Sequence, residues 1–360
     1  MKRIGAVCLF LFLVAAVFGT LLLHWEMKRQ QTEETVPAPA TNSILIYSQW
    51  PQGMAPILTE MAKEKAGISV VIREMTADEM KAAVREGQRA QVYLASQKVL
   101  MDLAEAGAFV PHISGVTDTV LTDFKDANGY WTGVWMNPVV FAVNADFMKR
   151  NPDFLYSWND VLQRSNVRLV MLDVSATEFS ADGLMAMVEH YGTDEAYRLL
   201  AAASSHVVQY AEFLSTPAQM AAMDKCDIGI SGYLEAKKLS DDGLPIRWFY
   251  PEDGTWCFVY GAALDKEAGE EAVAFLDWLL SDGGRDVKWR EAGYDFMQVN
   301  AEGLPEDAHG RRPEFWSLLK RYTEGGQKEL TERWIRSVRF GMGEPAETGE
   351  TEWKETGETE

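Results

Sequence analysis

Residues 228–264 read IGISGYLEAKKLSDDGLPIRWFYPEDGTWCFVYGAAL, and this stretch decides the fold. It predicts a strand, a helix, a second strand, a polar turn and a third strand. The first strand ends in small residues where the helix begins. Free N–H groups and the positive end of the helix dipole therefore face the space above the sheet, which suits an anion. The turn at residues 250–255 can carry the chain from one lobe to another.

Strands and helices alternate along the chain, which predicts open, mostly parallel sheets flanked by helices. In a first lobe we expect strands at 43–48, 68–73 and 91–95, and helices at 51–66, 77–86 and 97–106. After a crossing at 138–144, a second lobe follows with strands at 168–173, 207–210, 227–230 and 246–250, and helices at 179–191 and 194–203. Residues 257–264 should return to the first lobe, outside which helices at 267–280, 284–292, 313–322 and 330–338 should pack.

The segment 228–264, together with Tyr130-Trp131-Thr132-Gly133-Val134, resembles the extracellular solute-binding proteins of ABC importers. The most similar branch holds ferric-iron, aminoethylphosphonate and hexose-phosphate binders. The resemblance implies an α/β fold of the type II periplasmic-binding-protein class, with a hinge between two mostly parallel sheets. Lobe 1 should comprise 43–137 and 257–340, and lobe 2 should comprise 138–256.

Ligands of open α/β sheets bind beyond the carboxyl ends of strands, and two such lobes can close around them. In the resembled family, loops at these places supply ligand contacts. The candidate ligand-binding residues are Ser48, Gln49, Trp50, Ser96, Gln97, Trp131, Thr132, Ser175, Ala176, Thr177, Ser231, Gly232 and Tyr233. Two alternatives stay open: Ser175, Thr177 and Ser231 can serve as helix N-caps, and Trp131 can simply pack the lobe interface.

The solute class follows from what these loops contain. Ferric-binding members carry two adjacent tyrosines after the matching strand, where this chain has Gly232-Tyr233-Leu234. Its five histidines show no metal-ligand spacing, and no metal or other cofactor is expected. Hydroxyls and helix N-termini favour a small anion, such as a phosphonate, a phosphate ester or an organic acid. No basic residue lies in the candidate loops, and Arg247 is the nearest that could reach in. Ferric iron remains an alternative.

The chain ends predict location. Lys2 and Arg3 precede an uncharged apolar run at 4–23, which is long enough to span a bilayer and lacks a clear small-x-small cleavage site. We expect an uncleaved signal anchor in 1–29 and a tether at 30–42. The domain would lie on the periplasmic or extracellular face of the cytoplasmic membrane, or be secreted if the anchor is cut. The acidic segment 341–360 should be disordered.

Other classes of protein are less consistent with the sequence. The net charge of −20 argues against a nucleic-acid partner. Zinc-protease, Cys-x-x-Cys, phosphate-loop and Gly-x-Ser-x-Gly motifs are all missing, so no enzyme is predicted. The expected partners are a small solute, an ABC permease with its ATPase, and the membrane, with the protein a monomer. A ligand-sensing regulator of the same fold is the other possibility. Cys226 and Cys257 could form a disulfide or remain buried thiols.

Overall fold

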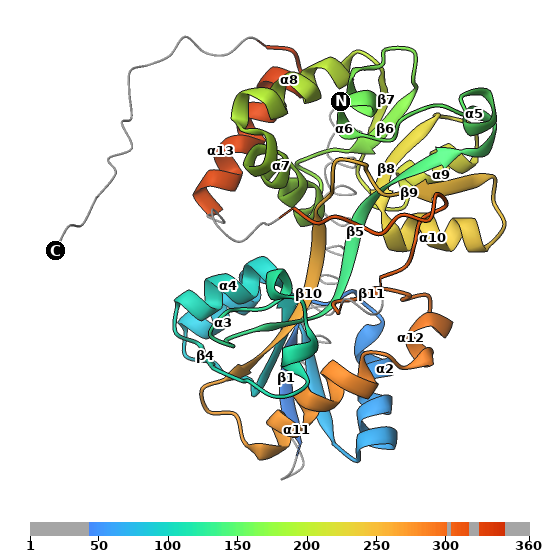
Figure 1. Cartoon of the computed structure of the whole chain (residues 1–360). Helices are drawn as coiled ribbons and strands as arrows, with labels where there is room; N and C mark the ends of the chain where they lie inside the picture. Colours follow the sequence, from blue (N-terminus) through green and yellow to red (C-terminus); the bar gives the residue numbers. More distant parts are fainter. Residues whose placement is uncertain (1–42, 301–303, 317–323, 343–360) are drawn as a thin grey trace, which may run out of the picture.

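The computed structural model describes residues 43–300, 304–316 and 324–342, and these residues form two lobes joined by long strands (Figure 1). The sheet order is β2-β1-β3-β10-β5-β8-β6-β7, with the short strands β4, β9 and β11 paired beside this path. β1, β2 and β3 are parallel in lobe 1, and β6, β7 and β8 are parallel in lobe 2. This is the predicted two-lobed α/β arrangement.

Lobe 1 contains the first three strands and the helices around them. Its strands are β1 (Ile44–Ser48), β2 (Val70–Glu74), β3 (Val92–Ser96), β4 (Phe109–Val110), β10 (Cys257–Asp265) and β11 (Met297–Gln298). Its helices are α2 (Met54–Met61), η1 (Ala62–Ala66), α3 (Ala77–Arg85), α4 (Gln97–Glu105), η2 (Thr117–Thr119), η3 (Thr122–Phe124), α11 (Glu270–Trp278), η4 (Leu279–Gly283) and α12 (Val287–Glu291). Trp135 lies at the centre of an aromatic core, with its ring 4.8 Å from that of Trp50 and 5.0 Å from that of Trp289.

Lobe 2 repeats the pattern around its own core. Its strands are β6 (Leu169–Leu172), β7 (Val207–Ala211), β8 (Ile228–Gly232) and β9 (Ile246–Phe249). Its helices are α5 (Ala145–Arg150), α6 (Trp158–Gln163), α7 (Glu178–Tyr191), α8 (Thr193–Ser204), α9 (Thr216–Ala222), α10 (Tyr233–Asp241), α13 (Glu324–Trp334) and η6 (Ile335–Arg339). Trp158 stacks on Trp256 with ring centroids 5.0 Å apart inside this core.

Strand β5 (Thr132–Asn144) connects the lobes, and all of its residues are buried. Its first half pairs with β10 and its second half with β8 and β9, so one strand belongs to both sheets. This is the crossing predicted at 138–144, although the strand already begins at Thr132. The return of the chain through 257–264 also occurs as predicted, in β10.

The C-terminal helices differ from the prediction. Residues 330–338 were expected on lobe 1, but α13 and η6 pack on α7 and α8 of lobe 2 (Figure 1). Trp334 and Val338 are buried in the core of that lobe, and the Tyr197 hydroxyl donates a hydrogen bond to the Leu330 carbonyl at 2.6 Å. Residues 313–316 are not helical either, because Trp316 packs on Trp256 there. The apolar face of a helix predicts that the helix packs against a core, but it does not predict which lobe provides that core.

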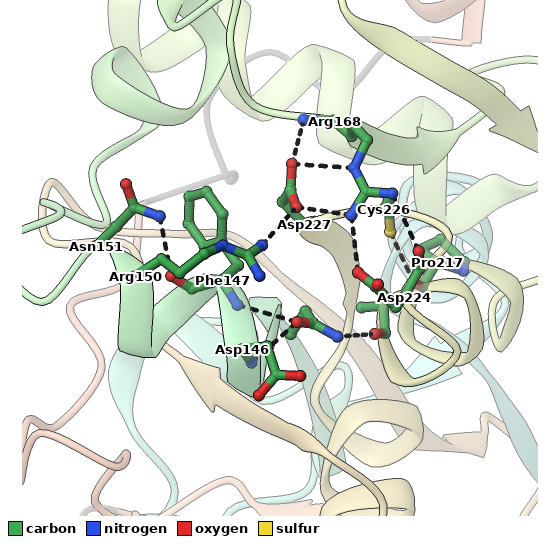
Figure 2. A network of polar contacts seen from close by, with 11 residues as sticks. Asp146, Phe147, Arg150, Asn151, Arg168, Pro217, Asp224, Cys226 and Asp227 are labelled. Atoms are coloured by element: carbon green, nitrogen blue, oxygen red, sulfur yellow. Dashed lines mark hydrogen bonds and ion pairs between the residues drawn. The ribbon is translucent and has the colours of Figure 1, made fainter.

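A polar network fixes the strand ends of lobe 2 that point away from lobe 1 (Figure 2). Just before β6, Arg168 donates from Nη2 to Asp227 Oδ1 and to Asp224 Oδ1, each at 2.8 Å. Both carboxylates raise the pKa of the guanidinium through these hydrogen bonds. Asp227 is buried directly before β8, so the network is structural and lies far from the carboxyl ends of the strands.

Both cysteines of the described chain are buried free thiols. Burial raises the pKa of Cys226 to about 12 and also raises the pKa of Cys257. Neither thiol is therefore a reactive thiolate at neutral pH.

Three predictions fall largely beyond the part of the chain that the structure describes. The signal anchor 1–29 and the tether 30–42 lie outside the described residues, and so does the tail from residue 343 onward. Within residues 43–300, 304–316 and 324–342, the structure has no helix with the length and apolar character needed to span a bilayer.

Candidate ligand-binding site

The carboxyl ends of β1 and β3 in lobe 1 face those of β6 and β8 in lobe 2. Glu178, the first residue of α7, connects the two sides. Its Oε2 accepts a hydrogen bond from Gln49 Nε2 at 3.0 Å, and its Oε1 accepts one from Ser96 Oγ at 2.7 Å. The Ser96 N–H in turn donates to Gln49 Oε1 at 3.0 Å. Two predicted residues of lobe 1 are thus joined across the cleft to the residue that follows Thr177.

A second polar group lies where β5 passes between the lobes. Asn137 is buried, and its Oδ1 accepts a hydrogen bond from the Leu234 N–H at 3.0 Å. Its Nδ2 donates to Glu235 Oε2 at 3.2 Å. At Gly232 a Cβ would come within 2.3 Å of Glu235 Oε2 and 2.7 Å of Asn137 Nδ2, so any other residue would have to displace these two side chains. The amide of Asn137 therefore holds the start of α10 against the crossing strand.

The two cleft carboxylates lie near a common phenol. Burial raises the pKa of Tyr260, and the negative charges of Glu235 and Glu178 raise it further. Burial also raises the pKa of Glu235, and the hydrogen bond from the neutral amide of Asn137 offsets this only in part. Burial therefore favours the neutral form of Glu235 on the α10 side of the cleft.

A pocket of about 460 Å³ opens between the lobes next to Glu178, and we call it the interlobe pocket. Residues of α3 and α4 line it from lobe 1, and residues of α7 and α13 line it from lobe 2. Its lining includes Lys98, Ser175, Thr177 and Glu178. The volume is in the range of small-molecule sites. A neighbouring pocket of about 480 Å³ touches Ser48, Gln49 and Trp50 on the lobe 1 side.

Lys98 is the unusual residue of the interlobe pocket. Its side chain is 7% exposed, and within the described residues it has no hydrogen-bond or ion-pair partner. It belongs to the first turn of α4, whose N-cap is Ser96. Buried lysines are rare unless they are paired, so an unpaired one beside a pocket is suited to an anionic ligand.

The predicted site residues divide into two sets. Those at the cleft or a pocket next to it are Ser48, Gln49, Trp50, Ser96, Ser175 and Thr177. Those buried in or beside the cores are Gln97, Trp131, Thr132, Ser231, Gly232 and Tyr233, while Ala176 is exposed. Tyr233 packs edge-on against Trp248, with ring centroids 5.1 Å apart. Ligand contact by any of them stays a prediction.

The capping alternative applies to only one of its three candidates. Thr177 caps α7 by accepting from the Ser180 N–H at 3.1 Å. Ser175 instead donates from Oγ to Asp173 Oδ1 at 2.5 Å. The Ser231 hydroxyl is fully buried and has no hydrogen-bond partner among the described residues, and α10 begins at Tyr233 with Gly232 as its N-cap and no side-chain cap.

Several residues of this site did not stand out in the sequence. Glu178 and Lys98 directly follow predicted residues, but a charge in a first helical turn usually faces solvent. Asn137 lies within an apolar run, and nothing nearby indicates its role. Arg247, which could have reached in, is exposed and donates to its neighbour's carbonyl at 2.9 Å. The basic residue next to the predicted site is instead Lys98, which follows Ser96 by two residues and lines the interlobe pocket from lobe 1.

Among the described residues, no three His, Cys, Asp or Glu side chains come together as ligands for a metal ion.

Comparison with known proteins gives three kinds of match. The family model for bacterial extracellular solute-binding proteins matches residues 50–295. An uncharacterised protein of Haemophilus influenzae is 25% identical over 255 residues, covering 66% of this chain and 72% of that protein.

Solved structures with 18–20% sequence identity share the fold. The periplasmic binding protein AfuA of Actinobacillus pleuropneumoniae, with fructose 6-phosphate bound, has a TM-score of 0.65 over 84% of this chain and 100% of its own. Iron-bound HitA of Pseudomonas aeruginosa has a TM-score of 0.63 over 83% and 98%, respectively. Apo FutA2 of Synechocystis has a TM-score of 0.66 over 82% and 99%.

Proposed function

Because the chain belongs to the bacterial extracellular solute-binding proteins of the ABC-importer type, we propose that it closes on a small anionic solute and delivers it to an ABC permease. Membership of this family makes it a binding protein and not an enzyme. The proposed solute is a phosphonate, a phosphate ester or an organic acid. The fructose 6-phosphate bound to AfuA belongs to the same chemical class.

The observation that carries the proposal is the composition of the interlobe pocket. Helices α4 and α7 come from opposite lobes, and the first turns of both line it. Each helix start offers N–H groups and the positive end of a dipole. Lys98 adds a positive charge that has no partner among the described residues. An anion in the pocket would contact both lobes at once and favour the closed form.

Ferric iron is a second candidate, because iron-bound HitA has the same fold. The environment of Tyr233 does not favour the binding of ferric iron. Burial raises the pKa of Tyr233, whereas a ferric ion is bound by phenolates. The ring of Tyr233 also packs on Trp248 inside lobe 2.

We further propose that residues 1–29 anchor the protein in the cytoplasmic membrane and that 30–42 tether a monomeric binding domain on its outer face. Such a tether would raise the local concentration of the closed form near the permease and its ATPase. A ligand-sensing role at the same membrane is the alternative. Deleting the gene should abolish uptake of the solute if the protein serves import, and should leave uptake intact but remove a transcriptional response if it serves sensing.

The direct test is a thermal shift of the full chain in detergent against phosphonates, phosphate esters, organic acids, polyamines and ferric iron. A ligand at about 100 times its Kd stabilises the folded protein by about 2.7 kcal/mol. For lobes of this size, that corresponds to a rise in Tm of roughly 5–10 °C. A rise selective for one class of anion is expected. A rise with ferric iron alone would contradict the proposed solute class.

A further inference from the structure

The carboxylate of Glu178 occupies a position that suits the acid group of a solute. It belongs to lobe 2, but both of its hydrogen-bond donors belong to lobe 1: Gln49 Nε2 at 3.0 Å and Ser96 Oγ at 2.7 Å. Ser96 is also the N-cap of α4, so the carboxylate lies at the positive end of that helix. The loops of lobe 1 therefore already bind a carboxylate, supplied by the protein itself.

A second observation indicates that this region accepts an anion from outside. Lys98 lies two residues beyond Ser96 and lines the interlobe pocket together with Glu178. Its side chain is 7% exposed, yet no ion pair with a described carboxylate forms, not even with Glu178. An incoming anion would give this buried lysine the partner of opposite charge that it lacks among the described residues. The pocket has room for one, at about 460 Å³.

We propose that Glu178 is an internal substitute for the acid group of the solute. In the ligand-free protein it holds Gln49 and Ser96 and keeps the lobes together. A solute carboxylate, phosphate or phosphonate displaces it, takes over these two donors and pairs with Lys98. The inference rests on the proposed function and narrows it, because it selects solutes with an oxyanion compact enough to fit between Ser96 and Lys98.

The displaced side chain of Glu178 can move toward solvent. The second cleft carboxylate, Glu235, need not repel the anion. Glu178 is only partly buried and lines the open pocket, so its carboxylate can turn toward water. Glu235 accepts a hydrogen bond from Asn137 beside Gly232, and its burial favours the neutral form. Asp78 and Glu332 also line the interlobe pocket, but Glu178 is the carboxylate that holds Gln49 and Ser96 and that an entering anion would displace.

The test compares four variants of the full chain, measuring Kd by calorimetry. The probes are inorganic phosphate, methylphosphonate, citrate and glucose 6-phosphate, with putrescine as a cationic probe. Glu178→Ala should bind at least one anion tenfold or more tightly than the wild type, and Glu178→Gln should do so to a smaller degree because it keeps an acceptor. Lys98→Met should weaken the same anion at least tenfold. Lys266→Met, which removes an exposed lysine of lobe 1 that does not line this pocket, should change Kd less than twofold.

Each other result overturns the inference. Unchanged or weaker anion binding in both Glu178 variants would show that the carboxylate is no competitor. Putrescine binding that is lost in Glu178→Ala would show that Glu178 recognises a cation. If no anion binds the wild type or the Glu178 variants, the solute class is wrong. In all three cases, solute uptake that depends on this gene would leave the proposed transport function standing, whereas loss of that dependence would refute the function itself.

Discussion

At the scale of single residues, the cleft is defined by charges that are not neutralised by partners of opposite sign. Glu235 is held only by the neutral amide of Asn137, and Lys98 has no partner among the described residues. Networks elsewhere are paired, as Arg168 is with Asp224 and Asp227. Perturbed, unpaired groups of this kind concentrate at functional sites. Of these two residues, Lys98 is the one that we expect to interact with the solute.

Glu235 gives a pH-dependent prediction. Burial raises its pKa in the folded protein above the ordinary value of 4.5 for a glutamate. Folding therefore disfavours the ionised form, and stability is lost as the pH rises from about 4.5 through the folded pKa. Glu235→Gln removes this loss and can keep the hydrogen bond from Asn137. We expect the variant and the wild type to have similar Tm values at pH 4.5, and the variant to have the higher Tm at pH 8. A wild type that is the more stable at pH 8 would contradict the assignment.

At the scale of elements, α7 contributes both to the cleft and to the core of lobe 2. Its N-terminal residue Glu178 reaches lobe 1, while Gly183 in the next turn lies against the ring of Trp256. A small cavity of about 30 Å³ remains among the apolar side chains around this contact. The glycine thus sets how closely the helix approaches the sheet, and with it the position of Glu178.

Gly183→Ala tests this packing, because two effects oppose each other. Alanine in a helix interior is favoured over glycine by about 1 kcal/mol. Its Cβ, however, would lie 2.2 Å from Trp256 Cζ2. Overpacking of a core costs about 1–3 kcal/mol, and the gain in helix propensity offsets about 1 kcal/mol of it, so we expect net destabilisation of up to about 2 kcal/mol. Chemical denaturation measures it, and the double variant with Trp256→Phe should recover part of the loss. A more stable single variant would show that the ring moves freely.

The alternation of strands and helices was sufficient to predict the elements, because buried parallel strands are short apolar runs that end at turn residues. It was insufficient for α13 and η6, whose apolar residues Trp334 and Val338 fit either lobe equally well as a pattern. The strand-end rule placed Gln49, Ser96 and Thr177 at one cleft. It could not predict Glu178 as their partner, since that contact spans 129 residues and depends on how the lobes meet.

At the scale of the whole molecule, contacts on both sides of the crossing strands hold the lobes together. Beside α4 and α7 they are the hydrogen bonds of Glu178. Beside α10 and α12, Lys237 Nζ lies 2.9 Å from Asp295 Oδ2, joining lobe 2 to lobe 1. Both side chains of this ion pair are partly exposed, so it is screened by salt.

Lys237→Met should open the ligand-free protein slightly. An exposed ion pair contributes about 0.2–1 kcal/mol, so the ratio of closed to open molecules should fall by at most about fivefold. Spin labels on the two lobes would report the distribution of distances, and 1 M salt should reproduce the effect in the wild type. Adding Glu178→Ala should open the protein further. An unchanged distribution in the double variant would mean that β5 alone sets the angle between the lobes.

The position of α13 has a consequence for how the protein is made. Lobe 2 begins at the crossing in β5, but its core is complete only when Trp334 and Val338 arrive, after the chain has returned to lobe 1 and left it again. The last described segment to be synthesised, α13 and η6, thus completes lobe 2, whose first strand lies nearly two hundred residues earlier in the chain. A nascent chain cannot finish lobe 2 until almost all of it has emerged from the ribosome. We expect this delay to leave lobe 2 incompletely folded during synthesis, and an incompletely folded chain is the form that can pass through a membrane channel.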